Sequence, residues 1–102
     1  MTLRFEWDEA KNLANQRKHG LGFEEALEVF QDPLVLTTQD RIENGEYRWQ
    51  AVGFVRSALV LVAYTVWEED DDDAQETTEV IRPISARYAS PKERRRYEQE
   101  NG

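Results

Sequence analysis

Apolar and polar residues alternate with a helical period in the first third of the chain and with a strand period after it. A first helix is predicted over Glu9 to Lys18, because Asp8 can cap its start and Gly20 can end it. One face of this helix carries residues that recur at helical spacing, namely Ala10, Leu13, Ala14 and Arg17.

A second helix is predicted over Phe23 to Phe30, and Asp32 followed by Pro33 is expected to end it. Its apolar stripe consists of Phe23, Ala26, Leu27 and Phe30. Its other face is expected to be solvated through Glu24, Glu25 and Glu28.

The strand period predicts four antiparallel strands, over Leu34–Thr38, Tyr47–Phe54, Ala58–Trp67 and Glu79–Ala86. The connections between them suit strands that pair with the next strand along the chain. They are a polar loop over Asp40–Gly45, a tight turn over Val55–Ser57 and a long acidic hairpin tip over Glu68–Glu79. A last helix, ending near Glu100, follows the capping box formed by Ser90, Pro91 and Glu93.

The expected fold is therefore one α+β domain spanning residues 1–102, with two N-terminal helices, a four-stranded antiparallel sheet and a C-terminal helix. The chain has no cysteine and only one histidine, which excludes disulfides and argues against a zinc site. The longest apolar run, Ala58 to Trp67, is too short to span a bilayer, and no leader segment precedes the first helix. We expect a soluble, cytoplasmic protein with no membrane partner, metal or cofactor.

Charge is distributed very unevenly around a net value of −8. Eight of the 21 acidic residues lie between Glu68 and Glu79, which leaves 13 acidic against 13 basic residues elsewhere. The acidic run lacks the spacing of a calcium loop, so a solvated hairpin tip is expected. The segment from Arg82 to Arg96 carries six basic residues and one acid, which indicates an anionic partner.

The predicted strand order brings basic residues from three segments to one end of the sheet. Charge-assisted hydrogen bonds from such a cluster can hold phosphates and stabilise a phosphorane-like transition state. The cluster would contain Arg56, Arg87, Lys92, Arg94, Arg95 and Arg96, with Arg82 in the middle of the last strand. The alternative is that the helix arginines are solvated and pair with Glu98 or Glu100.

Four further side chains have a chemical and a structural interpretation. His19 and Lys18 end the first helix, where they can either move protons and contact phosphate or cap the carbonyls of the last turn. Tyr97 either reaches a base or phosphate or packs in the core, and Ser85 is by default a hydroxyl bonded within the sheet. Trp49 and Trp67 are expected to be sheet aromatics.

Three stretches of sequence resemble the BrnT family of toxins from bacterial type II toxin–antitoxin systems. They are FEWDEAKNLANQRKHGLGFEEALEVFQDP, ALVLVAYT and IRPISARYASPKERRRYE, and the resemblance runs from Phe5 to about Glu98. It implies a RelE-like fold, metal-independent cleavage of RNA that inhibits translation and growth, and neutralisation in a hetero-oligomer with a BrnA-like antitoxin that carries a ribbon-helix-helix DNA-binding domain.

Carried onto this chain, the resemblance assigns proton transfer and phosphate contacts to Lys18, His19, Arg56, Arg82 and Arg87. It assigns RNA binding to Ser85, Lys92, Arg94, Arg95 and Tyr97. Pro83 departs from the family pattern, because a proline there removes a ladder donor and requires an edge or a bulge. The acidic segment is also longer than usual for the family.

The leading hypothesis is thus RNA cleavage by attack of the substrate's own 2′-hydroxyl on the adjacent phosphate. A second hypothesis is a non-enzymatic module that docks a DNA-binding partner and acts as a co-repressor. Direct DNA binding by the last helix is a third, which the net charge disfavours.

Overall fold

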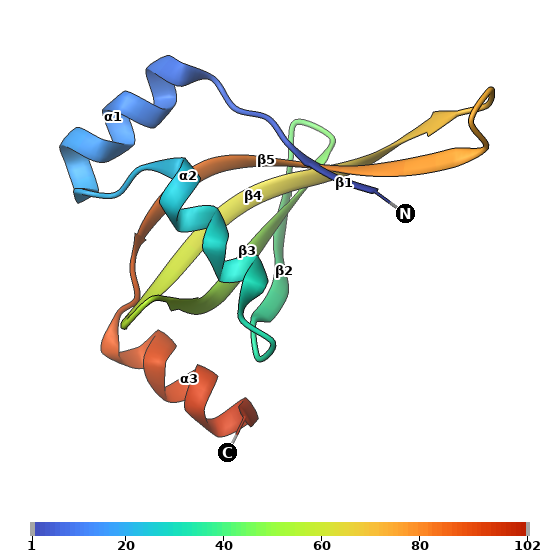
Figure 1. Ribbon diagram of the computed structural model, residues 1–102. Helices are drawn as coiled ribbons and strands as arrows, with labels where there is room; N and C mark the ends of the chain where they lie inside the picture. The colour runs from blue at the N-terminus through green and yellow to red at the C-terminus, as the bar shows by residue number, and fades with distance from the viewer. Residues whose placement is uncertain (1, 102) are drawn as a thin grey trace.

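The computed structural model describes residues 2–101, which form a five-stranded sheet with helical segments on both faces (Figure 1). In chain order the elements are β1 (Thr2–Phe5), α1 (Glu9–His19), α2 (Phe23–Ala26), the 3-10 helix η1 (Leu27–Gln31), β2 (Leu36–Glu43), β3 (Glu46–Val55), β4 (Ala58–Asp71), β5 (Glu76–Tyr88) and α3 (Pro91–Asn101).

The predicted four-stranded antiparallel sheet is wrong, because the sheet has a fifth strand and mixed pairing. The strand order is β1-β5-β4-β3-β2, and β1 pairs parallel to β5 while all other pairs are antiparallel. The missed strand contains only four residues, and Thr2 pairs with Thr78 at the far end of the chain. The pattern of residues 2–5 alone does not reveal this pairing, because these residues are extended only through their hydrogen bonds to β5.

The prediction of two N-terminal helices is also wrong in its second member. α2 contains four residues, and the chain then tightens into η1. In a 3-10 helix residues three apart lie above one another, so Val29 follows Ala26 onto the sheet and both are fully buried. Phe30, predicted to be on the stripe, is only partly buried and packs edge-on against Tyr64.

The first helix has the predicted ends, but the face with the regular helical spacing is not the face that it buries. The Asp8 carboxylate accepts a hydrogen bond from the Ala10 N–H, and Gly20 ends the helix with a φ of 70°. Leu13 is 45% exposed, however, whereas the buried residues are Asn12 and Asn15. No apolar side chain of α1 belongs to the core found within residues 2–101.

Both hairpins that were expected to end in long loops are strand almost to their tips. β2 runs through the predicted Asp40–Gly45 loop with a bulge after Gln39, and Asn44 and Gly45 form the turn with positive φ values. The predicted acidic tip is paired down to Asp71 opposite Glu76, so the acids lie on a two-stranded arm that projects beyond the helices (Figure 1). We call this segment, residues 67–80, the acidic arm.

The expectation for Pro83 is confirmed. β1 pairs with β5 only as far as Ile81, so Pro83 lies just beyond the end of β1. The β4–β5 register also shifts between Ala63 and Tyr64, which places a bulge at the same point. The capping box is likewise present, with reciprocal bonds between Ser90 and Glu93.

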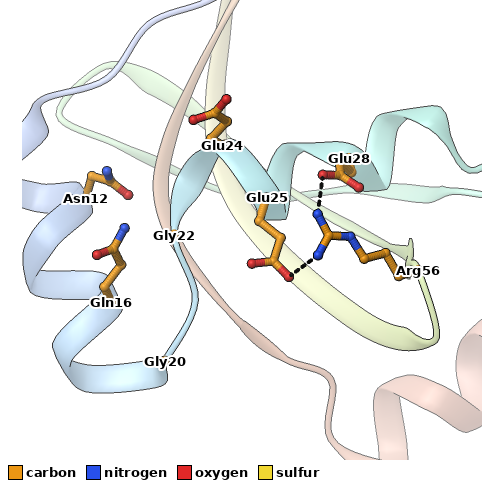
Figure 2. Close-up of a pocket in the computed structure, with 8 residues that line it drawn as sticks. All are labelled: Asn12, Gln16, Gly20, Gly22, Glu24, Glu25, Glu28 and Arg56. Atoms are coloured by element: carbon orange, nitrogen blue, oxygen red, sulfur yellow. Dashed lines mark ion pairs between the residues drawn. The ribbon is translucent and has the colours of Figure 1, made fainter.

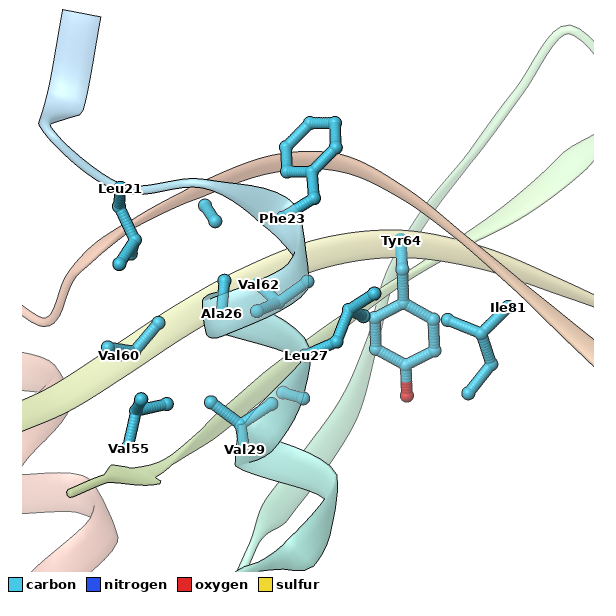
Figure 3. Packing of buried hydrophobic residues seen from close by; sticks show 12 residues of the cluster. Leu21, Phe23, Ala26, Leu27, Val29, Val55, Val60, Val62, Tyr64 and Ile81 are labelled. Atoms are coloured by element: carbon cyan, nitrogen blue, oxygen red, sulfur yellow. The ribbon is translucent and has the colours of Figure 1, made fainter. Parts of the chain in front are cut away.

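Core residues gather on both faces of the sheet. On the front face, α2 and η1 cover β3, β4 and β5 with side chains that include Phe23, Ala26, Leu27 and Val29 (Figure 3). Gly53 of β3 permits this approach, because a Cβ there would lie 3.0 Å from the Val29 carbonyl oxygen. On the back face a smaller cluster contains Val52, Leu59, Leu61 and Tyr97 of α3. Within residues 2–101 no helix is long and apolar enough to cross a bilayer.

Candidate active site

The polar face of α1 rests on the edge of β5 through the side chain of Asn15. Its Nδ2 donates to the carbonyls of Leu21 and Ala86 at 2.8 and 2.9 Å, and its Oδ1 accepts from the Ala86 N–H at 3.0 Å. Asn12 completes the attachment by accepting from the Phe23 N–H at 2.8 Å. Because the contact consists of directional hydrogen bonds rather than packed side chains, α1 stands on the strand edge and leaves a groove beside it.

This α1–β5 groove has a volume of about 330 Å³, and the structure brings three of the predicted site residues together in it. Lys18 and His19 come from the last turn of α1, and Ser85 comes from β5. The lining is completed by Lys11, Ala14, Asn15 and Ile84, and it contains no carboxylate.

Arg82 lies at the continuation of the groove toward the acidic arm. An adjoining pocket shares Lys11 with the groove and is lined by Arg82, Pro83 and the acidic residues Glu6 and Asp8. The Arg82 guanidinium is 4.9 Å from the centre of the Trp67 ring, and Glu6 is 3.7 Å away from it. The Arg82 side chain is half-exposed, and its contact with Glu6 is longer than a hydrogen bond. Its N–H donors are therefore available to an anion.

The groove has the chemical character of a phosphate-binding site. Two lysines and a hydroxyl can contact phosphate oxygens, and the His19 imidazole in the same lining can accept or donate a proton. Among residues 2–101, no three histidine, aspartate or glutamate side chains gather where they could hold a metal ion.

Arg56 lies away from these residues, on the other side of α1. It lines a separate pocket of about 500 Å³, where its guanidinium is 3.8 Å from Glu25 and 3.6 Å from Glu28 (Figure 2). With Glu24, this pocket contains three carboxylates and one cation, so it disfavours an anionic ligand. Arg56 has a φ of 58° in the β3–β4 turn, a conformation that a residue other than glycine adopts at a cost.

Arg87 is held by the start of α3. Its two terminal nitrogens donate to the two oxygens of Glu93 at 2.8 Å each, which holds the pKa of the Glu93 carboxyl at about 2. The Ser90 N–H also donates to the Glu93 carboxylate and contributes to this lowering of the pKa, and the Ser90 hydroxyl oxygen accepts from the Glu93 main-chain N–H. Arg87 and Arg56 thus have separate acidic partners, and neither of them lines the α1–β5 groove.

The remaining helix residues have structural surroundings of different kinds. Arg94 is 3.9 Å from Glu98 and lies over the Phe54 ring, as the solvated alternative expects. Lys92, Arg95 and Arg96 are exposed, and no ion pair within residues 2–101 involves them.

Tyr97 is 5% exposed and ties α3 to the segment before β2. Its hydroxyl donates to Asp32 at 2.7 Å, and burial together with this carboxylate raises the pKa of Tyr97 to about 12. Although burial alone would raise the pKa of Asp32, hydrogen bonds from Phe54, Tyr97 and Leu34 lower it. Tyr97 therefore has the packing role that was the alternative for it.

Sequence reasoning missed two residues that shape the groove. Lys11 is on the same face of α1 as Lys18, seven residues later, and this spacing was a readable signal. Asn15 gave no such signal, because a polar side chain within a helix is expected to be solvated.

Comparison with known families supplies an independent finding. A family model described as "Ribonuclease toxin, BrnT, of type II toxin-antitoxin system" matches residues 7–93. No curated protein gave a significant match.

Proposed function

The chain belongs to the BrnT family of ribonuclease toxins of type II toxin–antitoxin systems, and we propose that it cleaves RNA internally in the α1–β5 groove. The proposed cleavage needs no metal ion and inhibits translation in the cytoplasm. The antitoxin partner that the family implies is proposed to be a BrnA-like protein with a ribbon-helix-helix domain.

The α1–β5 groove is proposed as the cleavage site because of the charge of the side chains that line it. The α1–β5 groove combines Lys11, Lys18 and His19 with no carboxylate, whereas the larger pocket around Arg56 contains three carboxylates. A phosphodiester is drawn to the first lining and repelled by the second. Arg82 lies in the pocket that shares Lys11 with this groove, and its guanidinium beside the Trp67 ring can contact a neighbouring phosphate.

In the proposed reaction the 2′-hydroxyl oxygen attacks the adjacent phosphorus. The new bond joins O2′ to phosphorus, the bond from phosphorus to O5′ breaks, and the products are a 2′,3′-cyclic phosphate and a free 5′-hydroxyl. Neutral His19 accepts the 2′-hydroxyl proton, and protonated Lys18 donates one to the leaving oxygen. Lys11 and Arg82 stabilise the charge on the pentavalent phosphorus.

Cleavage of labelled RNA by the purified toxin, in the presence of a chelator, tests the proposal. His19→Gln and Lys18→Ala are expected to lower the rate by about 100-fold or more. The matched control is Arg41→Ala, which removes one exposed cation from β2 at the opposite edge of the sheet and should leave the rate unchanged.

Three results would contradict the proposal. The absence of cleavage of both free messenger RNA and translating ribosomes by a folded wild-type protein would remove the enzymatic function. Full loss of cleavage on adding the chelator, with recovery on adding back a divalent ion, would contradict metal independence. Full activity of both groove variants, combined with an inactive Arg56→Ala, would move the reaction to the other side of α1.

A further inference from the structure

The front face of the sheet is only partly covered, and an apolar groove remains open where α2 and η1 end. The groove has a volume of about 380 Å³ and lies between β1, η1 and the central strands. Its apolar lining consists of Leu3, Phe30, Trp49, Tyr64, Val66 and Ile81. Leu3 is 48% exposed at the rim, although an aliphatic side chain is stabilised by leaving water.

This apolar lining continues directly into an acidic pair on the same face of the arm. Val66 is opposite Ile81 in the β4–β5 ladder, and two residues farther out Glu68 is opposite Glu79. Residues two apart on a strand share a face, so the two carboxylates adjoin the groove. Burial together with the Glu79 carboxylate raises the pKa of Tyr64 to about 12, which agrees with this proximity.

Two carboxylates directly opposite one another destabilise a ladder unless a cation lies between them. Within residues 2–101, no lysine, arginine or histidine forms an ion pair with Glu68 or Glu79. The back face of the same arm differs, because Glu69 binds the Arg4 guanidinium at 2.9 Å and the Trp67 ring N–H at 3.0 Å. Arg4 thus neutralises Glu69 on the back face, next to the body of the sheet, whereas no ion pair within residues 2–101 neutralises Glu68 or Glu79 on the front face.

We propose that this surface, the groove together with Glu68 and Glu79, is where the antitoxin binds, through a segment that presents aliphatic side chains followed by lysine or arginine. The aliphatic side chains fill the groove and cover Leu3, and the basic ones lie between the two carboxylates. RNA is excluded as the occupant because its phosphates would be repelled by the same pair. The proposal rests on family membership, which supplies the antitoxin, and not on where RNA is cut.

The affinity of the purified toxin for its antitoxin, measured by calorimetry, tests this proposal. The double variant Glu68→Lys/Glu79→Lys is expected to bind at least about tenfold more weakly than the wild type. The matched control Asp72→Lys/Asp73→Lys makes the same charge change at the turn of the same arm and should bind within about twofold of the wild type.

The apolar half of the surface is tested by a second variant with a matched control. Leu3→Gln is expected to weaken binding about tenfold, whereas Leu34→Gln, at a residue 51% exposed elsewhere, should not change it. Wild-type affinity in both Leu3→Gln and the double glutamate variant would overturn the proposal. If the double variant does not fold, Glu79→Gln replaces it, with an expected loss of about threefold and the same contrary outcome.

Cleavage and growth assays separate this proposal from the proposed function. Glu68→Lys/Glu79→Lys should cleave RNA as the wild type does, and it should stop growth even when the antitoxin is co-expressed. Normal neutralisation of this variant would overturn the docking surface and leave the cleavage groove unaffected. A wild-type protein that binds the antitoxin through this surface but cleaves no RNA would overturn only the proposed function.

Discussion

α1 and the α2–η1 segment are neighbours on the same sheet, but they are held there by different forces. α2–η1 inserts Phe23, Ala26 and Val29, each fully buried, against β3, β4 and β5. α1 is longer, yet it buries only Asn12 and Asn15 and is attached through hydrogen bonds to main-chain groups. Apolar packing closes the space between a helix and a sheet, whereas the asparagine attachment fixes a helix at a strand edge and leaves the space beside it open.

The largest effect on stability is expected at Phe23, in the apolar attachment of α2–η1. Phe23→Ala is expected to lower the free energy of unfolding by about 3–5 kcal/mol, because it empties a fully buried site at the centre of the apolar attachment. Urea denaturation measures the loss. Leu34→Ala, at a half-exposed residue, serves as control and should change stability by less than about 0.5 kcal/mol. A loss below about 1 kcal/mol at Phe23 would show that α2–η1 is not held by its core residues.

Asn15→Ala tests the other attachment. It leaves the N–H and carbonyl of the fully buried Ala86 without a partner, and we expect a loss of about 2–3 kcal/mol. Gln16→Ala, the next residue on the helix, should cost less than about 0.5 kcal/mol. In the RNA cleavage assay, Asn15→Ala should lower the rate more than a Phe23→Leu variant of equal stability, because only Asn15 positions the helix that carries Lys18 and His19. Equal rates for the two variants would contradict this role.

α3 provides a third, titratable kind of attachment, through Arg87 and Glu93. The pKa of Glu93 is about 2 in the folded protein, against an ordinary value of 4.5, so the folded state binds this proton less readily. The resulting stabilisation is complete above pH 4.5 and is lost as the pH falls toward 2. Urea midpoints measured across this window should fall more steeply for the wild type than for Glu93→Gln. Parallel slopes would show that the ion pair does not hold α3.

The smallest effect is expected at Leu13. Leu13→Gln should change stability by less than about 0.5 kcal/mol, because this side chain is 45% exposed and lies on the outer face of α1. The helical spacing puts Leu13 on one face with Ala10 and Ala14, and if that face were buried, truncation of a leucine there would cost about 2–5 kcal/mol. A loss in that range, measured by urea denaturation, would show that this face is buried.

The sequence was informative wherever the structural cause lies within a few residues. Asp8, Gly20 and the Ser90–Glu93 capping box act on their own helices, and Pro83 excludes a ladder bond wherever it lies. The Leu13 face and the fifth strand were beyond local patterns. Whether an amphipathic helix buries its leucine or its asparagines depends on what its partner offers, and β5 offers main-chain groups rather than an apolar surface.

The candidate site was predicted only in part, and again local structure brings together the predicted residues that line one groove. Lys18, His19 and Ser85 come together because two of them share a helix end and the third lies on the strand beneath it. Arg56 and Arg87 were also predicted to be site residues, but they lie outside this groove and form ion pairs with Glu28 and Glu93. The number of charged residues along the chain does not predict these ion pairs, because they depend on which faces the helices present.

The position of β5 in the sheet determines when the proposed cleavage groove can exist. Its main chain lies between β1 and β4, and the bond from Asn15 to Ala86 joins residues 71 apart in sequence. Contacts so distant in sequence carry the entropic cost of closing a long loop. During synthesis β1 and α1 leave the ribosome long before the strand on which both rest, while the β2–β3–β4 meander can already pair. Translation therefore assembles most of the sheet before it completes the groove that is proposed to stop translation.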